Sequence, residues 1–263
     1  MDLGLEGKSV VITGGTRGIG LAAASAFLGE GASVVVAARK EEELRATEEK
    51  LSGKGRILTF RFDALDSSSF YSLADYAASM LGTIDVWVNN VGASHPKSAG
   101  EEYTEDDLRW TEAMCFESAV HGAQAAFRYM KDHGGSIVNI SSLAARVGTA
   151  GRSTIYGPLK AAVRLLSSNQ AAEYAAYGIR VNCVMPGFTM TETVQRSVSD
   201  SDKALVEERT LIRRMAKPEE IAWPIVFLSS DKASYITGTA LEVSGGRDVV
   251  LNPMYSYEKA GMI

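Results

Sequence analysis

Short apolar, β-branched runs alternate along the chain with longer segments of helical periodicity. The apolar runs are nearly continuous, which is typical of parallel strands covered on both faces. They predict strands at Lys8–Thr13, Ser33–Ala37, Arg56–Phe60, Ile84–Val88, Ser136–Ile140, Ile179–Val184 and Ala240–Val243. The segments between them predict crossover helices, chiefly Arg17–Glu30, Glu41–Leu51, Ser67–Leu81, Thr104–Lys131 and Ile155–Tyr177. This alternation predicts an α/β fold: a doubly wound parallel sheet of about seven strands with helices on both faces.

The pattern indicates a single domain over residues 1–263, because no linker, repeat or low-complexity segment interrupts it. The least regular region is Thr189–Lys217, which is polar and rich in Ser, Thr and charge. Residues 251–263 run past the last strand and carry Tyr255 and Tyr257. Such a tail either frays or docks on a neighbouring subunit.

The composition of the chain argues against several classes of function. A formal net charge of -5 argues against a general binder of nucleic acid or of membrane surfaces. No apolar run approaches the ~18 residues of a spanning helix, and the N-terminus lacks the pattern of a signal peptide. Cys115 and Cys183 lie far apart without a CxxC motif, which favours two reduced, buried thiols in a cytoplasmic protein. No His, Cys, Asp and Glu cluster has ligand-like spacing, so no metal site is expected.

A glycine-rich turn follows the first strand, and a helical pattern starts directly after it. Gly14, Gly18 and Gly20 have the spacing G-x-x-x-G-x-G, which differs from the more usual G-x-G-x-x-G. Glycine allows a sharp turn and a close approach of backbone N–H groups to a phosphate, and the helix N-terminus adds a positive dipole end. A glycine turn alone is weak evidence. Its position between a strand and an Ala-rich helix favours dinucleotide binding.

The end of the second strand bears on the choice of cofactor. An NAD-selective site usually has an acidic residue there, whereas an arginine accommodates the 2′-phosphate of NADP. Here the strand carries no acid and is followed by Arg39 and Lys40, while Arg17 in the glycine turn is another cation. A planar guanidinium suits phosphate binding. NADP(H) is therefore the predicted cofactor, with the alternative that Arg39 and Lys40 only begin a solvated helix.

Two further motifs carry a resemblance to a known family. Asn89-Asn90-Val91-Gly92 is similar to the Asn-Asn-Ala-Gly of classical, single-domain short-chain dehydrogenases/reductases, with Val91 in place of alanine. Asp63-Ala64 matches the position of that family's adenine contact. The resemblance extends from Leu5 to Gly246 and implies a Rossmann-type fold. It also implies a cofactor site formed by Gly14, Thr16, Arg17, Gly18, Ile19, Gly20, Arg39, Lys40, Asp63, Ala64, Asn90, Val91 and Gly92.

Tyr156 and Lys160 form a Tyr-x-x-x-Lys motif in a predicted helix. Residues four apart lie on one helical face, so the ammonium can stand beside the phenol. Tyrosine is ordinarily a weak acid with a pKa of ~10, and a neighbouring cation favours its phenolate. Pro158 between them is tolerable if Tyr156 lies in the first turn. The resemblance makes Tyr156 the acid/base, and it makes Lys160 its support and a contact of the cofactor ribose.

The fifth strand ends in Ser141 and Ser142. In the resembled family a serine here binds the substrate oxygen, and its spacing to the tyrosine favours Ser142. The match needs a loop about one residue longer than usual, and Ser141 is left to support the loop.

The sixth strand leads into a second cofactor motif. Pro186, Gly187, Thr189 and Thr191 resemble the family's Pro-Gly-x-x-x-Thr, which holds the nicotinamide carboxamide. A plain turn with a helix cap at Thr191 is the alternative.

Cys115 occupies the position at which the resembled family usually has asparagine, whose place in the long helix helps hold a water beside the lysine. Cysteine is a poor hydrogen-bonding substitute for an amide. Either the main chain holds the water alone, or the proton relay is broken and the protein is a catalytically silent dinucleotide-binding protein. The first reading is favoured here.

The leading hypothesis is an NADPH-dependent carbonyl reductase, in which hydride moves between nicotinamide and a carbonyl carbon while Tyr156 transfers the proton. An NAD(P)⁺-dependent alcohol dehydrogenase is the same chemistry in reverse. The substrate is a small carbonyl or alcohol compound, and the fold alone does not identify it. Residues 189–217 are the predicted lid, and His95 is either a plain loop residue or a substrate contact. The resemblance, with the apolar residues of the long helices, implies a homo-oligomer, a tetramer or else a dimer.

Overall fold

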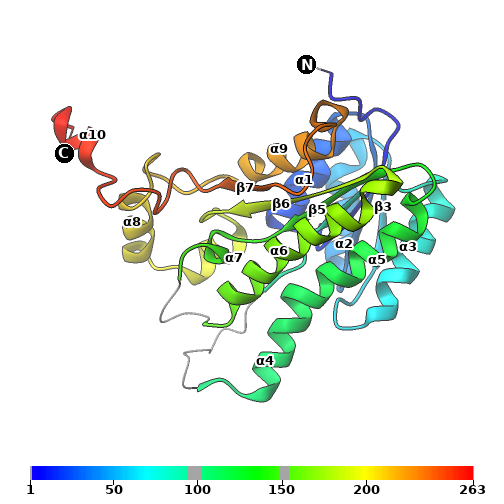
Figure 1. Ribbon diagram of the computed structural model, residues 1–263, viewed down its shortest axis with the longest axis horizontal. Coiled ribbons are helices and arrows are strands. Elements are labelled where there is room, and N and C mark those ends of the chain that lie inside the picture. The colour runs from blue at the N-terminus through cyan, green and yellow to red at the C-terminus, as the bar shows by residue number, and fades with distance from the viewer. Residues whose placement is uncertain (1, 94–101, 149–153, 263) are drawn as a thin grey trace.

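The computed structural model describes residues 2–93, 102–148 and 154–262. These residues form a seven-stranded sheet in the order β3-β2-β1-β4-β5-β6-β7, in which every neighbouring pair is parallel (Figure 1). The strands are β1 (Ser9–Thr13), β2 (Ser33–Ala38), β3 (Ile57–Arg61), β4 (Val86–Asn89), β5 (Gly135–Ile140), β6 (Ile179–Pro186) and β7 (Ala240–Val243). The strand order reverses between β1 and β4, which is where ligands bind in sheets of this kind. The predicted fold class is confirmed.

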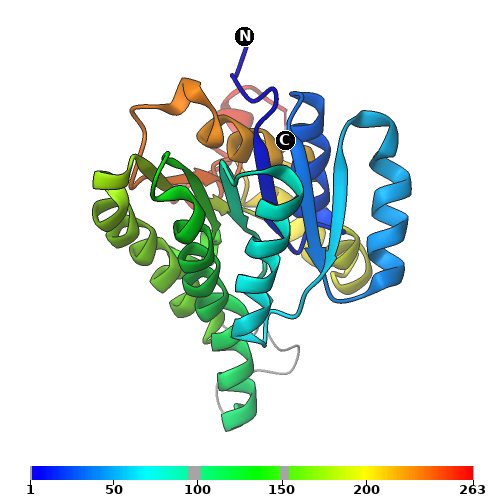
Figure 2. The same ribbon diagram turned by 90° about the vertical axis from the view of Figure 1, so that its right-hand side faces the viewer.

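Helices connect the strands and cover both sides of the sheet (Figures 1 and 2). The α-helices are α1 (Gly18–Gly29), α2 (Glu41–Leu51), α3 (Ser67–Leu81), α4 (Glu105–Glu112), α5 (Ser118–Met130), α6 (Tyr156–Tyr174), α7 (Glu192–Ser197), α8 (Asp200–Glu208), α9 (Pro218–Ser229) and α10 (Tyr255–Lys259). Short 3-10 turns lie at Ser52–Lys54, Leu143–Ala145, Ala175–Tyr177 and Asp231–Ala233. None of the helices within the described ranges is long and apolar enough to cross a membrane.

Successive strand residues enter two separate cores. Val10 and Ile12 of β1 pack with α1 and α9, whereas Val11 between them packs with α3 and α5 on the other face. Because both faces are covered, both sets of side chains must be apolar. This explains why the strand runs are continuous in the sequence.

The long helix predicted over Thr104–Lys131 is present but is not uniform. Its start is fixed by a capping box, in which Thr104 Oγ1 accepts from the N–H of Asp107 at 3.1 Å and the Asp107 carboxylate accepts from the N–H of Thr104 at 3.1 Å. A π-helical turn over Ala113–Glu117 then separates α4 from α5. Such turns insert one extra residue and are frequent at functional sites. Cys115 lies at the middle of this turn.

Two regions are more regular than the sequence indicated. Residues 189–217 contain α7 and α8, which begin with side-chain caps at Thr191 and Ser199. Helix α9 was not among the main predicted helices, although it buries Ile221, Ile225 and Leu228.

The C-terminal tail docks on its own chain. It leaves the body on the same side as α8 (Figure 1). Tyr257 Oη donates to the carbonyl of Leu211 at 2.7 Å, and the Arg213 guanidinium lies 5.2 Å from the Tyr257 ring centroid. The tail is thereby fixed to the segment that follows α8.

Candidate functional site

The candidate residues gather at the carboxyl edge of the sheet, where β1, β4, β5 and β6 end. Parallel strands bring the residues that follow them to the same edge. The glycine turn follows β1, Asn90 follows β4, Ser141 and Ser142 follow β5, and Gly187 follows Pro186 at the end of β6.

The glycine turn forms a tight cradle at the start of α1. Gly14 and Gly18 have left-handed backbones, with φ of 68° and 52°. A Cβ on Gly20 would collide with the carbonyl oxygen of Gly14, so the turn lies directly against the helix start. The first N–H groups of a helix, here from Gly18, Ile19 and Gly20, have no partner within the helix. A cradle of this kind fits a phosphate, and hence the pyrophosphate of a dinucleotide.

Asn90 ties the glycine turn to β4. Its Nδ2 donates to the carbonyls of Gly14 at 2.8 Å and Thr13 at 3.2 Å, and its N–H donates to Thr13 Oγ1 at 3.2 Å. The amide of Asn90 is therefore used inside the protein, where it fixes the cradle. Val91 lies beside it, because a Cβ on Gly14 would be 3.4 Å from Val91 Cγ2.

The cations expected near a 2′-phosphate divide into two groups. Arg17 and Arg39 are exposed, and neither forms an ion pair with another described residue. Lys40 Nζ lies 3.3 Å from Glu43 Oε1, and Thr16 Oγ1 donates to Glu43 Oε2 at 3.2 Å. Glu43 was not singled out from the sequence, although its i,i+3 spacing from Lys40 is the signal that could have found it.

The turn after β3 is formed by Asp63 and Ala64. The carboxylate of Asp63 accepts from the N–H of Leu65 at 3.1 Å, and its own N–H donates to Ser69 Oγ at 3.1 Å. Ala64 is buried against the core that also contains Phe62 and Phe70. This turn therefore has a fixed backbone beside the end of β3.

Tyr156 and Lys160 stand as the helical spacing predicts. Tyr156 is the first residue of α6, and Lys160 Nζ lies 5.8 Å from the centroid of its ring. Lys160 is only 2% exposed, and its Nζ donates to the carbonyl of Ile140 at 2.8 Å. Pro158 falls in the first turn, where a backbone N–H has no helical partner to lose. A Cβ on Gly92 would be 2.6 Å from Lys160 Nζ, so this glycine makes room for the ammonium.

The two serines after β5 differ in surroundings. Ser141 is 3% exposed, and its Oγ donates to the carbonyl of Lys160 at 2.6 Å. Ser142 is half-buried and begins the 3-10 turn Leu143–Ala145, with its Oγ accepting from the N–H of Ala144 at 3.1 Å. The Ser141 hydroxyl donates to the helix that carries Lys160, whereas the Ser142 hydroxyl accepts a hydrogen bond within its own turn. That Ser142 rather than Ser141 contacts the substrate oxygen stays a prediction.

Gly157 brings the first turn of α6 close to the 3-10 turn Leu143–Ala145. A Cβ on Gly157 would be 2.8 Å from the carbonyl oxygen of Ala144. The first turn of α6 therefore packs directly on the 3-10 turn that Ser142 begins. A second contact fixes this helix start, since the N–H of Ile155 donates to Tyr103 Oη at 3.3 Å.

Cys115 bridges the π-turn and the loop after β4. It is 1% exposed, and its Sγ donates to the carbonyl of Ala93 at 3.0 Å. Burial raises the pKa of the Cys115 thiol, and the nearby Lys160 charge only partly opposes this effect. Burial raises the pKa of Cys183 in the same way. Both thiols are free and buried, as predicted, and at neutral pH they remain protonated.

The loop after β6 approaches the glycine turn. A Cβ on Gly18 would be 3.0 Å from Thr191 Cγ2, so the N-cap of α7 lies against the start of α1. Thr191 Oγ1 accepts from the N–H of Val194 at 3.3 Å, and Thr189 Oγ1 donates to the carbonyl of Gly187 at 3.1 Å. The two ends of the predicted cofactor site thus lie side by side, with Thr191 also serving as the helix cap that the alternative reading expected.

A series of buried, hydrogen-bonded side chains, which the sequence did not reveal, connects the strands beneath the site to α6. Trp87 Nε1 donates to Asn89 Oδ1 at 2.7 Å, and Asn89 Nδ2 donates to Asn139 Oδ1 at 2.8 Å. Asn139 Nδ2 continues to Ser167 Oγ at 2.9 Å and to Gln170 Oε1 at 3.2 Å on α6. Because buried polar groups are costly unless bonded, this chain fixes α6 against β4 and β5.

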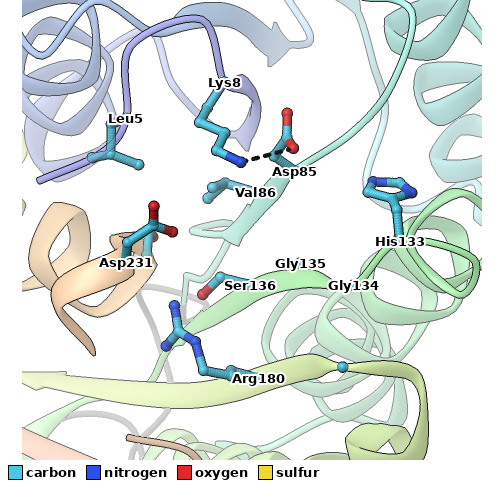
Figure 3. A pocket seen from close by; sticks show the side chains of 12 residues that line it. Leu5, Lys8, Asp85, Val86, His133, Gly134, Gly135, Ser136, Arg180 and Asp231 are labelled. Atoms are coloured by element: carbon cyan, nitrogen blue, oxygen red, sulfur yellow. Dashed lines mark ion pairs between the residues drawn. The ribbon is translucent and has the colours of Figure 1, made fainter. Parts of the chain in front are cut away.

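A cavity of ≈ 200 Å³ lies at the opposite edge of the sheet, where the strands begin (Figure 3). The Lys8 and Arg180 cations that line it already have partners. Lys8 Nζ lies 3.6 Å from Asp85 Oδ1, and the Arg180 guanidinium donates to the carbonyls of Leu228, Ser230 and Ile236. Burial lowers the pKa of Arg180. This cavity is remote from Tyr156 along the strands and does not belong to the predicted site.

His95 lies outside the described residues. Among the residues that the structure does describe, no three His, Cys, Asp or Glu side chains are grouped so as to hold a metal ion.

Comparison with known proteins gives concordant matches over nearly the whole chain. The model of a family described as enoyl-(acyl carrier protein) reductase matches residues 14–248. An L-rhamnose 1-dehydrogenase (NAD(P)(+)) of Sphingomonas sp. (strain SKA58) is 36% identical over 94% of this chain and 98% of its own length. An NADP-dependent (R)-specific alcohol dehydrogenase of Lentilactobacillus kefiri is 33% identical over 92% and 97%. A short-chain type dehydrogenase/reductase of Mycobacterium marinum superposes with a TM-score of 0.90 at 31% identity, over 95% and 98% of the two chains.

Proposed function

The chain belongs to the short-chain dehydrogenase/reductase family, and on this basis we propose that it is an NADPH-dependent carbonyl reductase or, in reverse, a secondary-alcohol dehydrogenase, with Tyr156 as acid/base. The observation that carries the proposal is the pair formed by Tyr156 and the buried Lys160 at the carboxyl edge of the sheet. A buried ammonium beside a phenol has a clear chemical use, because its charge offsets the negative charge left on the oxygen when the phenol gives up its proton.

Tyr156, Ser142 and Lys160 have different roles in the proposed reaction. When bound, the nicotinamide ring supplies the hydride for reduction or accepts it for oxidation. In the reductive direction Tyr156 donates its phenolic proton to the substrate oxygen, while Ser142 donates a hydrogen bond to the same oxygen. Lys160 stabilises the resulting phenolate, and the Ile140 carbonyl fixes its ammonium at 2.8 Å. A positioned proton donor contributes roughly 10²–10⁴-fold in rate.

The cofactor would be held along the carboxyl edge. The amides of Gly18, Ile19 and Gly20 would hold the pyrophosphate, and the exposed Arg17 and Arg39 would bind the 2′-phosphate of NADPH. The names of the relatives support a nicotinamide cofactor, since one is an NADP-dependent enzyme and another is designated NAD(P)(+). The free guanidinium groups and the acid-free end of β2 favour NADPH in this chain.

We also propose that residues 189–217, which contain α7 and α8, act as the substrate lid. The segment starts beside the glycine turn at Thr191 and carries the buried Val198 and Val206. The homo-oligomeric state and the cytoplasmic location stay predictions.

The experiment is a panel of ketones assayed with NADPH on the parent protein, Tyr156→Phe and the control Tyr177→Phe. Tyr177 follows the same helix and is 45% exposed. Tyr156→Phe keeps the ring but lacks the proton, so turnover should fall at least ~10²-fold while NADPH affinity stays the same. Turnover of the control should be normal. NADPH binding without turnover of any ketone by the parent would instead identify a catalytically silent protein.

A further inference from the structure

Arg247 follows the two glycines at the end of β7, and its guanidinium joins three parts of the molecule. Its side chain is only 11% exposed. Nη1 donates to the carbonyl of Val206 in α8 at 3.0 Å, and the guanidinium carbon lies 4.9 Å from the ring centroid of Phe188, in the loop after β6. Nε lies 3.2 Å from the Asp248 carboxylate, which balances the buried charge.

The contact with α8 is made at the end of the helix where a cation is most favourable. Val206 lies in the last turn of α8, whose carbonyls have no partner within the helix. The negative end of the helix dipole also attracts a cation. Thr210 Oγ1 donates to the same carbonyl at 2.6 Å. Val206 is the one buried side chain of this nine-residue helix, so few other contacts hold α8 in place.

The backbone of Arg247 is in turn held by Arg146, which follows the 3-10 turn Leu143–Ala145. Arg146 Nη2 donates to the Arg247 carbonyl at 3.2 Å, and Arg146 Nη1 donates to the Asp248 carbonyl at 3.3 Å. The guanidinium of Arg146 also forms a two-bond pair with Glu242 of β7, at 2.8 and 3.2 Å. Arg146 directly follows the 3-10 turn that Ser142 begins. A continuous series of contacts therefore runs from that turn through Arg146 and Arg247 to α8.

We propose that Arg247 is a positioning residue that holds α8 closed, and that it sets the affinity for the carbonyl substrate without taking part in the chemical step. The inference rests on the proposed function, because it treats residues 189–217 as the lid of a reductase. If the lid is held shut in only a fraction of molecules, the apparent dissociation constant of the substrate rises by the inverse of that fraction. Hydride and proton transfer in the closed complex stay the same.

The substitution Arg247→Met tests this role. Methionine keeps a long apolar stem against Phe188 but cannot donate to Val206. Arg209→Met is the matched control. Arg209 is the exposed C-cap residue of the same helix, and its side chain donates no hydrogen bond to α8. Arg247→Lys, which keeps the charge, should recover part of the effect.

The first readout is amide hydrogen exchange of the NADPH-loaded protein, which needs no known substrate. Exchange in α8 should accelerate about tenfold in Arg247→Met and stay at the parent rate in Arg209→Met, while α5 and β5 are unaffected in both. The second readout uses whichever ketone of ethyl acetoacetate, acetophenone and cyclohexanone the parent reduces fastest. Its KM should rise about tenfold with kcat within twofold, which is the signature of lost binding.

Unchanged exchange of α8 in Arg247→Met would overturn the proposal. So would acceleration spread equally over α5 and β5, which would show a general loss of stability. A fall in kcat at constant KM would also contradict it. If the parent reduces none of the ketones but exchange in α8 still accelerates in Arg247→Met, the proposed function is contradicted. The role of Arg247 in holding α8 closed is then still supported.

Discussion

Two glycines of α1 offer the same substitution with opposite expected results. Gly20 is the third residue of the helix and Gly29 is its last, and neither has a left-handed backbone. A Cβ on Gly20 would collide with the carbonyl oxygen of Gly14 and would lie 2.9 Å from Gly15 Cα and 2.6 Å from Asn90 Nδ2. A Cβ on Gly29 would meet nothing within 4 Å. Gly20→Ala therefore tests the cradle, and Gly29→Ala is its control.

The magnitudes follow from these contacts. Two of the atoms facing Gly20 belong to the backbone, which cannot turn aside as a side chain can, so the insertion should cost about 1–3 kcal/mol of unfolding free energy. For a chain of this size each kcal/mol shifts Tm by roughly 2–4 °C, so Gly20→Ala should unfold about 2–12 °C lower. Gly29→Ala removes backbone freedom of the unfolded chain at an open site and should gain about 0.4–1 kcal/mol.

Cofactor binding separates the two variants further. Relief of the clash at Gly20 moves the Gly14–Gly15 turn away from the helix start, and with it the amides that face a phosphate. We expect this displacement to cost at least about 1.4 kcal/mol of the binding free energy of NADPH. That loss corresponds to a tenfold higher Kd for NADPH in Gly20→Ala. Fluorescence titration with NADPH measures Kd, and thermal unfolding measures Tm. An unchanged Kd in a folded Gly20→Ala would refute the assignment of this turn to the pyrophosphate.

The remaining predictions concern individual side chains. Lys160→Met should weaken NADPH binding and lower kcat, because the buried ammonium beside Tyr156 is lost; a Kd and a kcat equal to the parent's would contradict the role of Lys160. Glu43→Gln should tighten the binding of NADPH but not of NADH, because it frees Lys40. Arg39→Asp should reverse the preference for NADPH over NADH. Comparable changes in Kd for both dinucleotides would refute these assignments. Cys115→Asn should leave kcat nearly unchanged if the main chain holds the water, whereas a clear rise in kcat would show that the thiol impairs the relay.

The sheet and the motif positions could be predicted from sequence because they rest on local signals. Continuous β-branched runs identify buried strands, and the glycine spacing identifies the turn after β1. Tyr156 and Lys160 need only the helical period to be placed on one face. In each case the information lies within a few consecutive residues.

Helix α9 shows where such signals fail. Its residues Ile221–Leu228 form an apolar run with Pro224 inside it, and a run of that length is ambiguous between a buried strand and a buried helix. What fixes the helix start is a contact outside the run, in which Glu220 accepts from the N–H of Lys217 at 2.8 Å and pairs with Arg214 at 2.6 Å. The Arg214 guanidinium and this backbone N–H lower the pKa of Glu220 to about 2.

The π-turn at Cys115 could not be predicted for a related reason. Its hydrophobic pattern is that of an ordinary helix, and the extra residue changes only which carbonyl each N–H reaches. The turn brings the Cys115 thiol to the Ala93 carbonyl, a contact between residues 22 apart in sequence. The thiol thereby joins the middle of the π-turn to Ala93, a few residues after the end of β4.

The glycines of the site also have contacts that the sequence does not indicate. Sequence motifs reveal that glycine occurs at Gly18, Gly92 and Gly157, but not which group each one admits. The structure gives the partners: the Thr191 side chain, the Lys160 ammonium and the Ala144 carbonyl. At Gly157 a Cβ would meet a backbone carbonyl, whereas at Gly18 and Gly92 it would press on the Thr191 methyl and on the Lys160 ammonium. We therefore expect substitution of Gly18, Gly92 or Gly157 to displace the Thr191 turn, the Lys160 ammonium or the start of α6, respectively, without changing the chemical groups of Tyr156, Lys160 or Ser142.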